Sequence, residues 1–184
     1  MTLMVSKWTG IAKSPSLSRS VTTTGRATLK KQSDLNPAES TPITPAFPRW
    51  ERSFVSGPAS TLFQVEHSIS NQDSQVLFTK VKFLPHSEGP PGHVHGGATA
   101  GLLDEAMGIL VWHHGFASLT QTIQIDFKKA IPLSEPCLIV TRIDSIGEQK
   151  VGVSCTIFDS SHHPHVTGKG LFHRLTKEQL SRFK

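Results

Sequence analysis

The clearest pattern in the chain is an almost continuously apolar stretch at residues 97–113. Apolar side chains fall on nearly every side of a helix drawn through this stretch, so it lacks the polar face of a surface helix. We therefore expect a helix that is enclosed by the rest of the protein. Small residues are interleaved with the large ones and would let strands pack closely around it; they are Ala98, Ala100, Gly101, Ala106 and Gly108.

Other stretches have the β-branched and aromatic content of strands and are bounded by turn residues. They lie at 61–69, 76–84, 118–127, 137–146, 149–158 and 165–175. One helix among six such strands, most of them joined by hairpin-length links, predicts an α+β fold in which a curved antiparallel sheet wraps around one long central helix. A short terminal helix should follow Thr176, because Thr176 and Gln179 match a capping box.

The segment before the first strand divides into two parts. Residues 36–49 contain four prolines and little periodicity, which predicts a proline-rich linker ahead of a domain at 50–184. Residues 1–33 carry six basic residues, many Ser and Thr, and no acidic residue. This composition is typical of an organellar transit peptide, so we expect residues 1–35 to be either such a peptide or a disordered basic tail. The first alternative favours the mitochondrion, or another organelle such as a plastid; the second favours the cytoplasm.

The charge and hydropathy of the remaining chain argue against a nucleic-acid partner and against a membrane span. Without the six basic residues of the tail, residues 34–184 hold 13 basic and 14 acidic side chains. No basic stripe interleaved with aromatic residues is present there, so we expect no nucleic-acid partner. The chain also lacks a stretch of about 18 uncharged apolar residues, so we expect no membrane span.

Neither the histidines nor the cysteines predict a metal site. The pair His93 and His95 would need a glutamate four or five residues later to resemble a cupin site, and Thr99 and Ala100 stand there. The run "SSHHPH" at 160–165 is typical of a polar hairpin turn. The only two cysteines, at 137 and 155, are too few for a disulfide framework and are expected to be small core residues.

The most unusual residue of the predicted helix is Asp104. Burial of a carboxylate is costly, so an acid inside an apolar helix needs a role, either in chemistry or as a structural hydrogen-bond partner or subunit-edge residue. The motif "HVHGG" precedes it and places His95, Gly96 and Gly97 at the helix start, where backbone N–H groups are unpaired. Such donors could form an oxyanion hole for a substrate carbonyl, although two glycines can also simply make a tight turn.

Thr120 is a further candidate on the strand at 118–127. Its hydroxyl could face the helix and orient a water molecule or the acid, whereas the alternative is ordinary β-branched strand filling. Glu105 lies about 100° around the helix from Asp104, so we interpret it as a structural or interface residue with only a minor chance of sharing the role of base.

Taken together, these motifs resemble those of hotdog-fold acyl-CoA thioesterases of the PaaI-like type, most closely the mitochondrial thioesterase-superfamily-member (THEM) proteins. The resemblance rests on "GPPGHVHGG", on Asp104 nine residues after His95, and on Thr120 sixteen residues after Asp104. The strand segment "IDFKKAIPL" and the "VSC" of the next hairpin also match.

The resemblance implies hydrolysis of an acyl-CoA, with a medium- to long-chain acyl group, to free fatty acid and CoA, without a cofactor. It implies that the Gly96 N–H polarises the thioester carbonyl and that His95 supports the turn. Asp104 would act as general base or nucleophile, and Thr120 would position the water. The expected substrate-binding residues are Gly97, Lys128 and Lys129; the lysines would bind CoA phosphates, or else form a solvated strand end.

Two points qualify this expectation. Many relatives have Asn or Gln six residues before the histidine of His-Gly-Gly, where this chain has Gly89, so the positioning of water must differ. The alternative functions are a non-catalytic module that senses acyl-CoA or binds a protein, and a hotdog hydratase.

The spacing of Gly96 and Asp104 bears on assembly. Eight helical residues span about 12 Å, which is too far for both groups to contact one thioester. We therefore expect a homodimer, or a dimer of dimers, whose sites combine the glycine of one subunit with the aspartate of the other.

Overall fold

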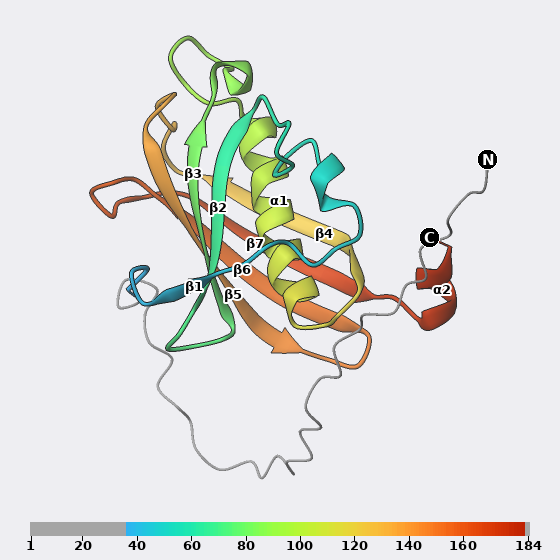
Figure 1. The fold of residues 1–184 in the computed structure, drawn as a ribbon. Helices are drawn as coiled ribbons and strands as arrows, with labels where there is room; N and C mark the ends of the chain where they lie inside the picture. The colour runs from blue at the N-terminus through green and yellow to red at the C-terminus, as the bar shows by residue number, and fades with distance from the viewer. Residues whose placement is uncertain (1–35, 183–184) are drawn as a thin grey trace, which may run out of the picture.

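The long helix expected from the apolar stretch is α1 (Gly96–His113), which packs against an antiparallel sheet in the computed structural model (Figure 1). The structure describes residues 36–182. The expected transit peptide or basic tail, residues 1–35, therefore lies outside the described residues. Within 36–182, no helix is long and apolar enough to cross a membrane.

Seven strands form the sheet of the described region, in the order β1-β2-β3-β5-β6-β7-β4, and all their pairings are antiparallel. They are β1 (Ser40–Pro42), β2 (Phe63–Ser70), β3 (Val76–Phe83), β4 (Ser118–Phe127), β5 (Pro136–Ile146), β6 (Lys150–Phe158) and β7 (Pro164–Arg174). The expected α+β architecture, a sheet around one main helix, is confirmed, and the six expected strands differ from β2–β7 by at most two residues at either end.

The expected linker at 36–49 is corrected in part, because it contains β1. Ser40 pairs with Ser70 and Pro42 with Ser68, so the segment extends the sheet beyond β2. Proline is compatible with this position because an edge strand need not donate a hydrogen bond on its outer side. Ile43 then packs against the main core.

Between β1 and β2 the chain crosses α1, passing over it on the side opposite β4 and β7 (Figure 1). We call residues 43–60 the crossover segment; it includes the short 3-10 helix η2 (Trp50–Arg52). A second 3-10 helix, η3 (Pro85–Ser87), precedes α1, and α2 (Lys177–Ser181) follows β7. The capping box expected at Thr176 and Gln179 is present, which confirms the start of α2.

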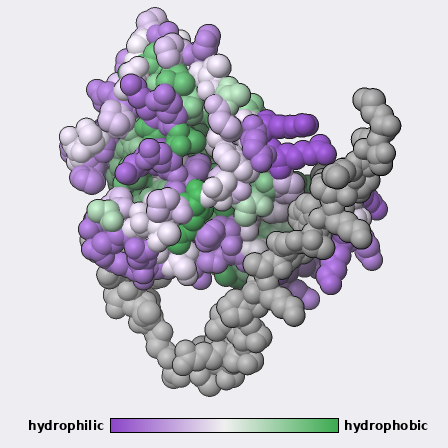
Figure 2. All heavy atoms as spheres, viewed as in Figure 1, coloured by the Kyte–Doolittle hydropathy of each residue, from purple (hydrophilic) through white to green (hydrophobic). Residues whose placement is uncertain are grey.

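The core lies between α1 and the sheet face that it covers. Five large side chains of α1 are fully buried there: Leu102, Leu103, Met107, Ile109 and Leu110. Gly170 of β7 makes room for them, because a Cβ at this position would lie 3.0 Å from Met107 Sδ. Both cysteines are buried and free, as expected of small core residues. Figure 2 shows a mostly polar exterior with apolar atoms visible in narrow depressions.

Candidate active site

The site begins at the start of α1, where His95 is the N-cap residue. Its Nδ1 accepts a hydrogen bond from the Gly97 N–H at 2.9 Å. The Gly97 N–H is therefore already used within the chain, which limits the part that this residue can take in binding substrate. Since Nδ1 is an acceptor, the neutral ring carries its proton on Nε2, and this tautomer makes His95 a potential donor on its exposed side.

Gly96 supplies the free donor of the helix start. No residue of 36–182 accepts a hydrogen bond from its N–H, as is usual for the first turn of a helix. A Cβ at Gly96 would lie 3.6 Å from the Phe127 ring, so the backbone here faces β4. The N–H and the positive end of the helix dipole together favour an oxygen that carries negative charge.

A cavity of about 300 Å³ borders this helix start and contains both expected lysines. Gly96, Thr99 and Phe127 form one part of its wall, and Lys128 and Lys129 form another. The structure thus brings Gly96 and the two basic residues to one place, at the end of β4.

Asp104 and Thr120 meet in a different place. The Thr120 hydroxyl donates a hydrogen bond of 2.7 Å to Asp104 Oδ1, which joins the middle of α1 to β4. They line a cavity of about 200 Å³ together with Phe54, Gly101 and Trp112. The hydroxyl therefore faces the helix and contacts the acid, as one of the two alternatives for Thr120 expected.

A β-bulge explains how Thr120 reaches the helix. Thr120 pairs with Phe172, and Thr122 pairs with the adjacent Leu171, so Gln121 is an extra residue in the strand. If side chains alternated strictly along β4, Thr120 would lie on the same face of the sheet as Thr122 and Gln124. The bulge instead puts it on the same face as Ile123, and bulges next to active sites commonly re-aim a side chain in this way.

Glu105 points away from the Asp104–Thr120 pair and binds the crossover segment. Its carboxylate accepts hydrogen bonds from the Ser53 hydroxyl at 2.6 Å, from the Ser56 N–H at 3.1 Å and from the Ser56 hydroxyl. This contact network agrees with the structural interpretation of Glu105.

The crossover segment is the part of the site that sequence reasoning missed. Phe47, Phe54 and Val55 line the cavity of Asp104, and Phe54 remains 73% exposed. The apolar and aromatic residues at 47–55 could have indicated a packed segment. The neighbouring prolines led instead to the prediction of a linker.

This chain has Gly89 where many relatives have Asn or Gln, and the structure gives a steric reason for the difference. A Cβ at this position would lie 2.8 Å from His95 Cα and 3.1 Å from its Cδ2. The His95 side chain therefore occupies the space next to Gly89, and Asn or Gln could enter there only if the loop shifted.

The two halves of the expected site are separate within one chain. Gly96 and the lysines line one cavity, and Asp104 and Thr120 line the other. Both cavities border β4, which is an edge strand and pairs only with β7 among the described residues. Large apolar side chains on this strand are exposed: Leu119 by 49%, Ile123 by 38% and Phe127 by 55%.

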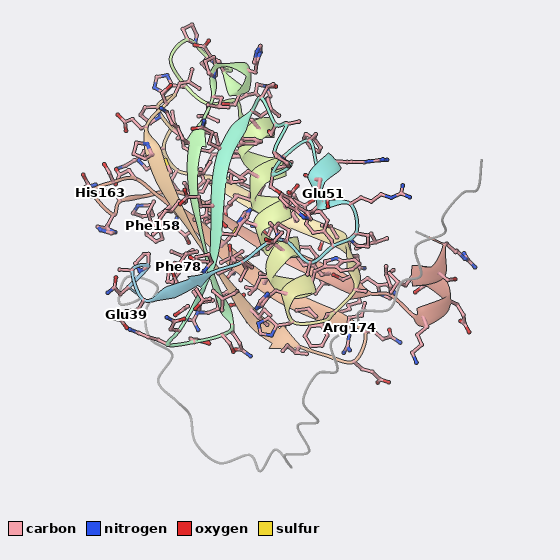
Figure 3. The ribbon with its side chains drawn as sticks, viewed as in Figure 1. Glu39, Glu51, Phe78, Phe158, His163 and Arg174 are labelled. Carbon is pink, nitrogen blue, oxygen red and sulfur yellow. The ribbon has the colours of Figure 1, made fainter. Side chains whose placement is uncertain are left out.

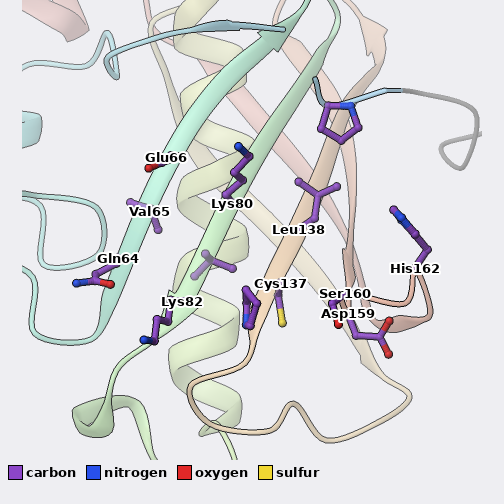
Figure 4. A pocket seen from close by; sticks show the side chains of 13 residues that line it. Gln64, Val65, Glu66, Lys80, Lys82, Cys137, Leu138, Asp159, Ser160 and His162 are labelled. Carbon is purple, nitrogen blue, oxygen red and sulfur yellow. The ribbon is translucent and has the colours of Figure 1, made fainter. Parts of the chain in front are cut away.

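The histidine-rich turn takes no part in either cavity lined by Asp104 or Gly96. Within 36–182, no three His, Cys, Asp or Glu side chains are grouped so that they could hold a metal ion. A larger hollow of about 590 Å³ lies on β2, β3 and β5 beside this turn, and it contains none of the expected site residues (Figure 4).

Comparison with known proteins bears on the family. Residues 91–164 match the model of the thioesterase superfamily. Acyl-coenzyme A thioesterase THEM4 of Rattus norvegicus is 34% identical over 95 residues, 51% of this chain and 41% of that protein. Acyl-coenzyme A thioesterase THEM5 of Homo sapiens is 30% identical over 113 residues, 61% of this chain and 44% of that protein. The chain thus spans less than half the length of these relatives.

A solved structure bears on the fold. The PaaI protein of E. coli superposes with a TM-score of 0.55 at 16% identity, covering 62% of this chain and 80% of PaaI. At this identity the likeness concerns the fold. The fold implied by the resemblance is thereby confirmed, and the match to the thioesterase superfamily model extends over residues 91–164.

Proposed function

We propose that the chain hydrolyses acyl-CoA thioesters to a free fatty acid and CoA, because residues 91–164 match the thioesterase superfamily model and the fold resembles that of PaaI. The observation that carries this proposal is the contact between Thr120 and Asp104, on the helix whose first N–H group is free. A carboxylate base held in place and an oxyanion donor are the two elements that this route of thioester hydrolysis uses.

In the proposed mechanism, Thr120 occupies Oδ1 of Asp104, and Oδ2 accepts a proton from water. The oxygen of this water forms a bond to the thioester carbon, and the carbonyl oxygen becomes an oxyanion that the Gly96 N–H stabilises. A donor of this kind contributes about 2.7–4 kcal/mol to transition-state stabilisation. The intermediate then breaks its carbon–sulfur bond, and the proton on Asp104 passes to the departing thiolate.

Two chains form each site in this proposal. One subunit supplies Gly96 and the lysines, and its partner supplies Asp104 and Thr120. The separate cavities and the exposed apolar side chains of the unpaired edge of β4 support a homodimer built along this strand.

We further propose a medium- to long-chain acyl group as the substrate. Its support is the apolar lining of the cavity beside Asp104, where Phe47, Phe54 and Trp112 lie.

Release of free thiol from acyl-CoAs of increasing chain length tests the function. We expect turnover with maximal kcat/KM in the medium to long range. Absence of turnover with every chain length would instead favour the second function, a non-catalytic acyl-CoA-sensing or protein-binding module.

For localisation we propose the mitochondrion, on the composition of residues 1–35 alone. A reporter fused to this segment should enter the organelle, and a diffuse cytosolic signal would contradict the proposal.

A further inference from the structure

The segment that carries the two lysines is held in place by one buried histidine. We call residues 128–130 the lysine segment. The backbone carbonyl of His165 accepts hydrogen bonds from the Lys128 N–H at 2.9 Å and from the Lys129 N–H at 3.0 Å. The His165 ring also contacts the segment, because Nδ1 lies 2.9 Å from the Ala130 carbonyl oxygen. His165 is 8% exposed, so it is a buried support and not a surface ligand.

The other ring nitrogen of His165 contacts Asp159. Nε2 lies 3.2 Å from Asp159 Oδ2. A carbonyl and a carboxylate can only accept, so the ring donates through both nitrogens when both bonds are made. His165 therefore links the lysine segment to the β6–β7 turn by two directional bonds.

Asp159 is itself fixed by the turn. Its Oδ1 accepts from the His163 N–H at 2.8 Å and from the Ser161 N–H at 2.9 Å. These contacts, led by the bond from His163, lower the pKa of Asp159 to about 2, so it is a carboxylate at neutral pH. Figure 4 shows Asp159 in the turn together with Ser160 and His162, and Figure 3 shows the exposed His163 at the end of the same hairpin.

The lysine segment continues directly to the helix start. The Ile131 carbonyl accepts a hydrogen bond of 2.9 Å from the Val94 N–H, two residues before Gly96. The position of the lysines relative to Gly96 is therefore set from two sides, by Val94 and by His165.

We propose that His165 is a positioning residue for substrates that carry nucleotide phosphates: together with Asp159 it holds the lysine segment so that Lys128 and Lys129 stand beside Gly96. This inference rests on the proposed function. Its consequence is selective, since a displaced lysine segment weakens binding of the phosphates of CoA but leaves the Asp104–Thr120 pair unchanged.

The test compares two thioesters of one acyl group, an acyl-CoA and the acyl-pantetheine that lacks the nucleotide. His165→Leu should raise KM for the acyl-CoA about 5- to 20-fold, with kcat within about twofold and KM for the acyl-pantetheine almost unchanged. In a background without both lysines the same substitution should have no further effect on KM.

Two variants of Asp159 test whether its hydrogen bonds are needed, one that keeps them and one that removes them. Asn at 159 can accept from the turn through Oδ1 and donate from Nδ2 to a neutral His165, so Asp159→Asn should keep KM near the wild-type value. Asp159→Ala should raise KM for the acyl-CoA as His165→Leu does, and it carries the test should His165→Leu fail to fold. Ser160→Ala, at an exposed residue of the same turn (Figure 4), is the matched control and should leave both KM values unchanged.

Equal effects on both thioesters, or no effect on either, would overturn the proposal. A wild-type protein that hydrolyses neither thioester would refute the proposed function instead. Calorimetric titration with CoA and with pantetheine then decides on His165: a selective loss of CoA affinity in His165→Leu supports its role, and any other result overturns it.

Discussion

At the scale of single residues, the environment of each polar group determines what it can do. Asp104 is half-buried and receives one hydrogen bond, so one carboxylate oxygen remains for chemistry. Glu105, its neighbour, accepts three hydrogen bonds from the crossover segment and is committed to structure. Two adjacent acids therefore have different hydrogen-bond partners, because the helix points them in different directions.

The role of Asp104 is tested by Asp104→Asn. The substitution keeps the size of the side chain and removes its basic oxygen, so kcat should fall by about 10²- to 10⁴-fold while the protein still folds and binds acyl-CoA. Steady-state kinetics and a binding titration measure the two effects. More than a tenth of wild-type activity would exclude Asp104 as the base.

His67 makes stability depend on pH. It is buried, its Nδ1 lies 2.9 Å from the Thr79 hydroxyl, and burial lowers its pKa from 6.5 to about 4. Between these values the unfolded chain binds a proton that the folded chain does not, so stability is full above pH 6.5 and is lost as pH falls toward 4. The loss from this group should be about 1 kcal/mol at pH 5.5 and about 2–3 kcal/mol at pH 4.5.

Urea unfolding of the wild type and of His67→Asn across this range isolates the effect. Asn can still accept from the Thr79 hydroxyl but does not titrate. The difference in unfolding free energy between the two proteins should therefore change with pH; a constant difference would show that His67 is not responsible.

At the scale of elements, the bulge in β4 and the crossover segment determine how the site is built. The bulge turns Thr120 toward α1, while the crossover segment closes the opposite side of the Asp104 cavity. Gln121 of the bulge and the crossover segment contribute no expected catalytic group, yet the bulge aims Thr120 at Asp104 and the segment forms a wall of the cavity.

The attachment of the crossover segment can be removed by Glu105→Ala. The two serines and the Ser56 N–H would lose their acceptor, which should destabilise the fold by about 1–3 kcal/mol. KM for long-chain acyl-CoA should rise more than KM for acetyl-CoA, because the segment lines the apolar cavity. Chemical denaturation and kinetics with both substrates measure this, with Glu51→Ala, on an exposed glutamate of the same segment (Figure 3), as the control. Equal changes in both KM values would separate the segment from acyl binding.

At the scale of the whole molecule, the arrangement of sheet and helix followed from the hydrophobic pattern, because α1 and six strands each have a strong local signal. For Thr120 the sequence left open both a contact with the helix and ordinary strand filling, and the structure has the contact. The bulge had no such signal, since Gln121 lies between Thr120 and Thr122, and three consecutive polar residues tolerate either face. β1 was missed because its pairing with β2 is long-range, and the prolines around it are normally read as breaks.

Assembly provides the whole-molecule prediction. If each site combines Gly96 of one subunit with Asp104 of the other, inactive Asp104→Asn and inactive Gly96→Pro chains should restore activity when refolded together. Half of the dimers would be mixed and each would have one intact site, giving about a quarter of wild-type activity. Proline fits the first position of a helix, so Gly96→Pro removes the N–H with little strain.

Differently tagged chains allow the mixed dimers to be purified, and each variant refolded alone is the control. Purified mixed dimers as inactive as their parents would rule out a shared site.

Because Cys137 and Cys155 are buried, the native protein should react slowly with thiol reagents. Burial raises the pKa of Cys137 to about 11 and that of Cys155 to about 12, so almost no thiolate is present at neutral pH. Any thiol detected during turnover then comes from the leaving group and not from the folded enzyme. Conversely, Cys155 lies next to Gly168, as does Leu103 of α1, so the rate at which Cys155 becomes alkylated reports how often the space between α1 and the sheet opens.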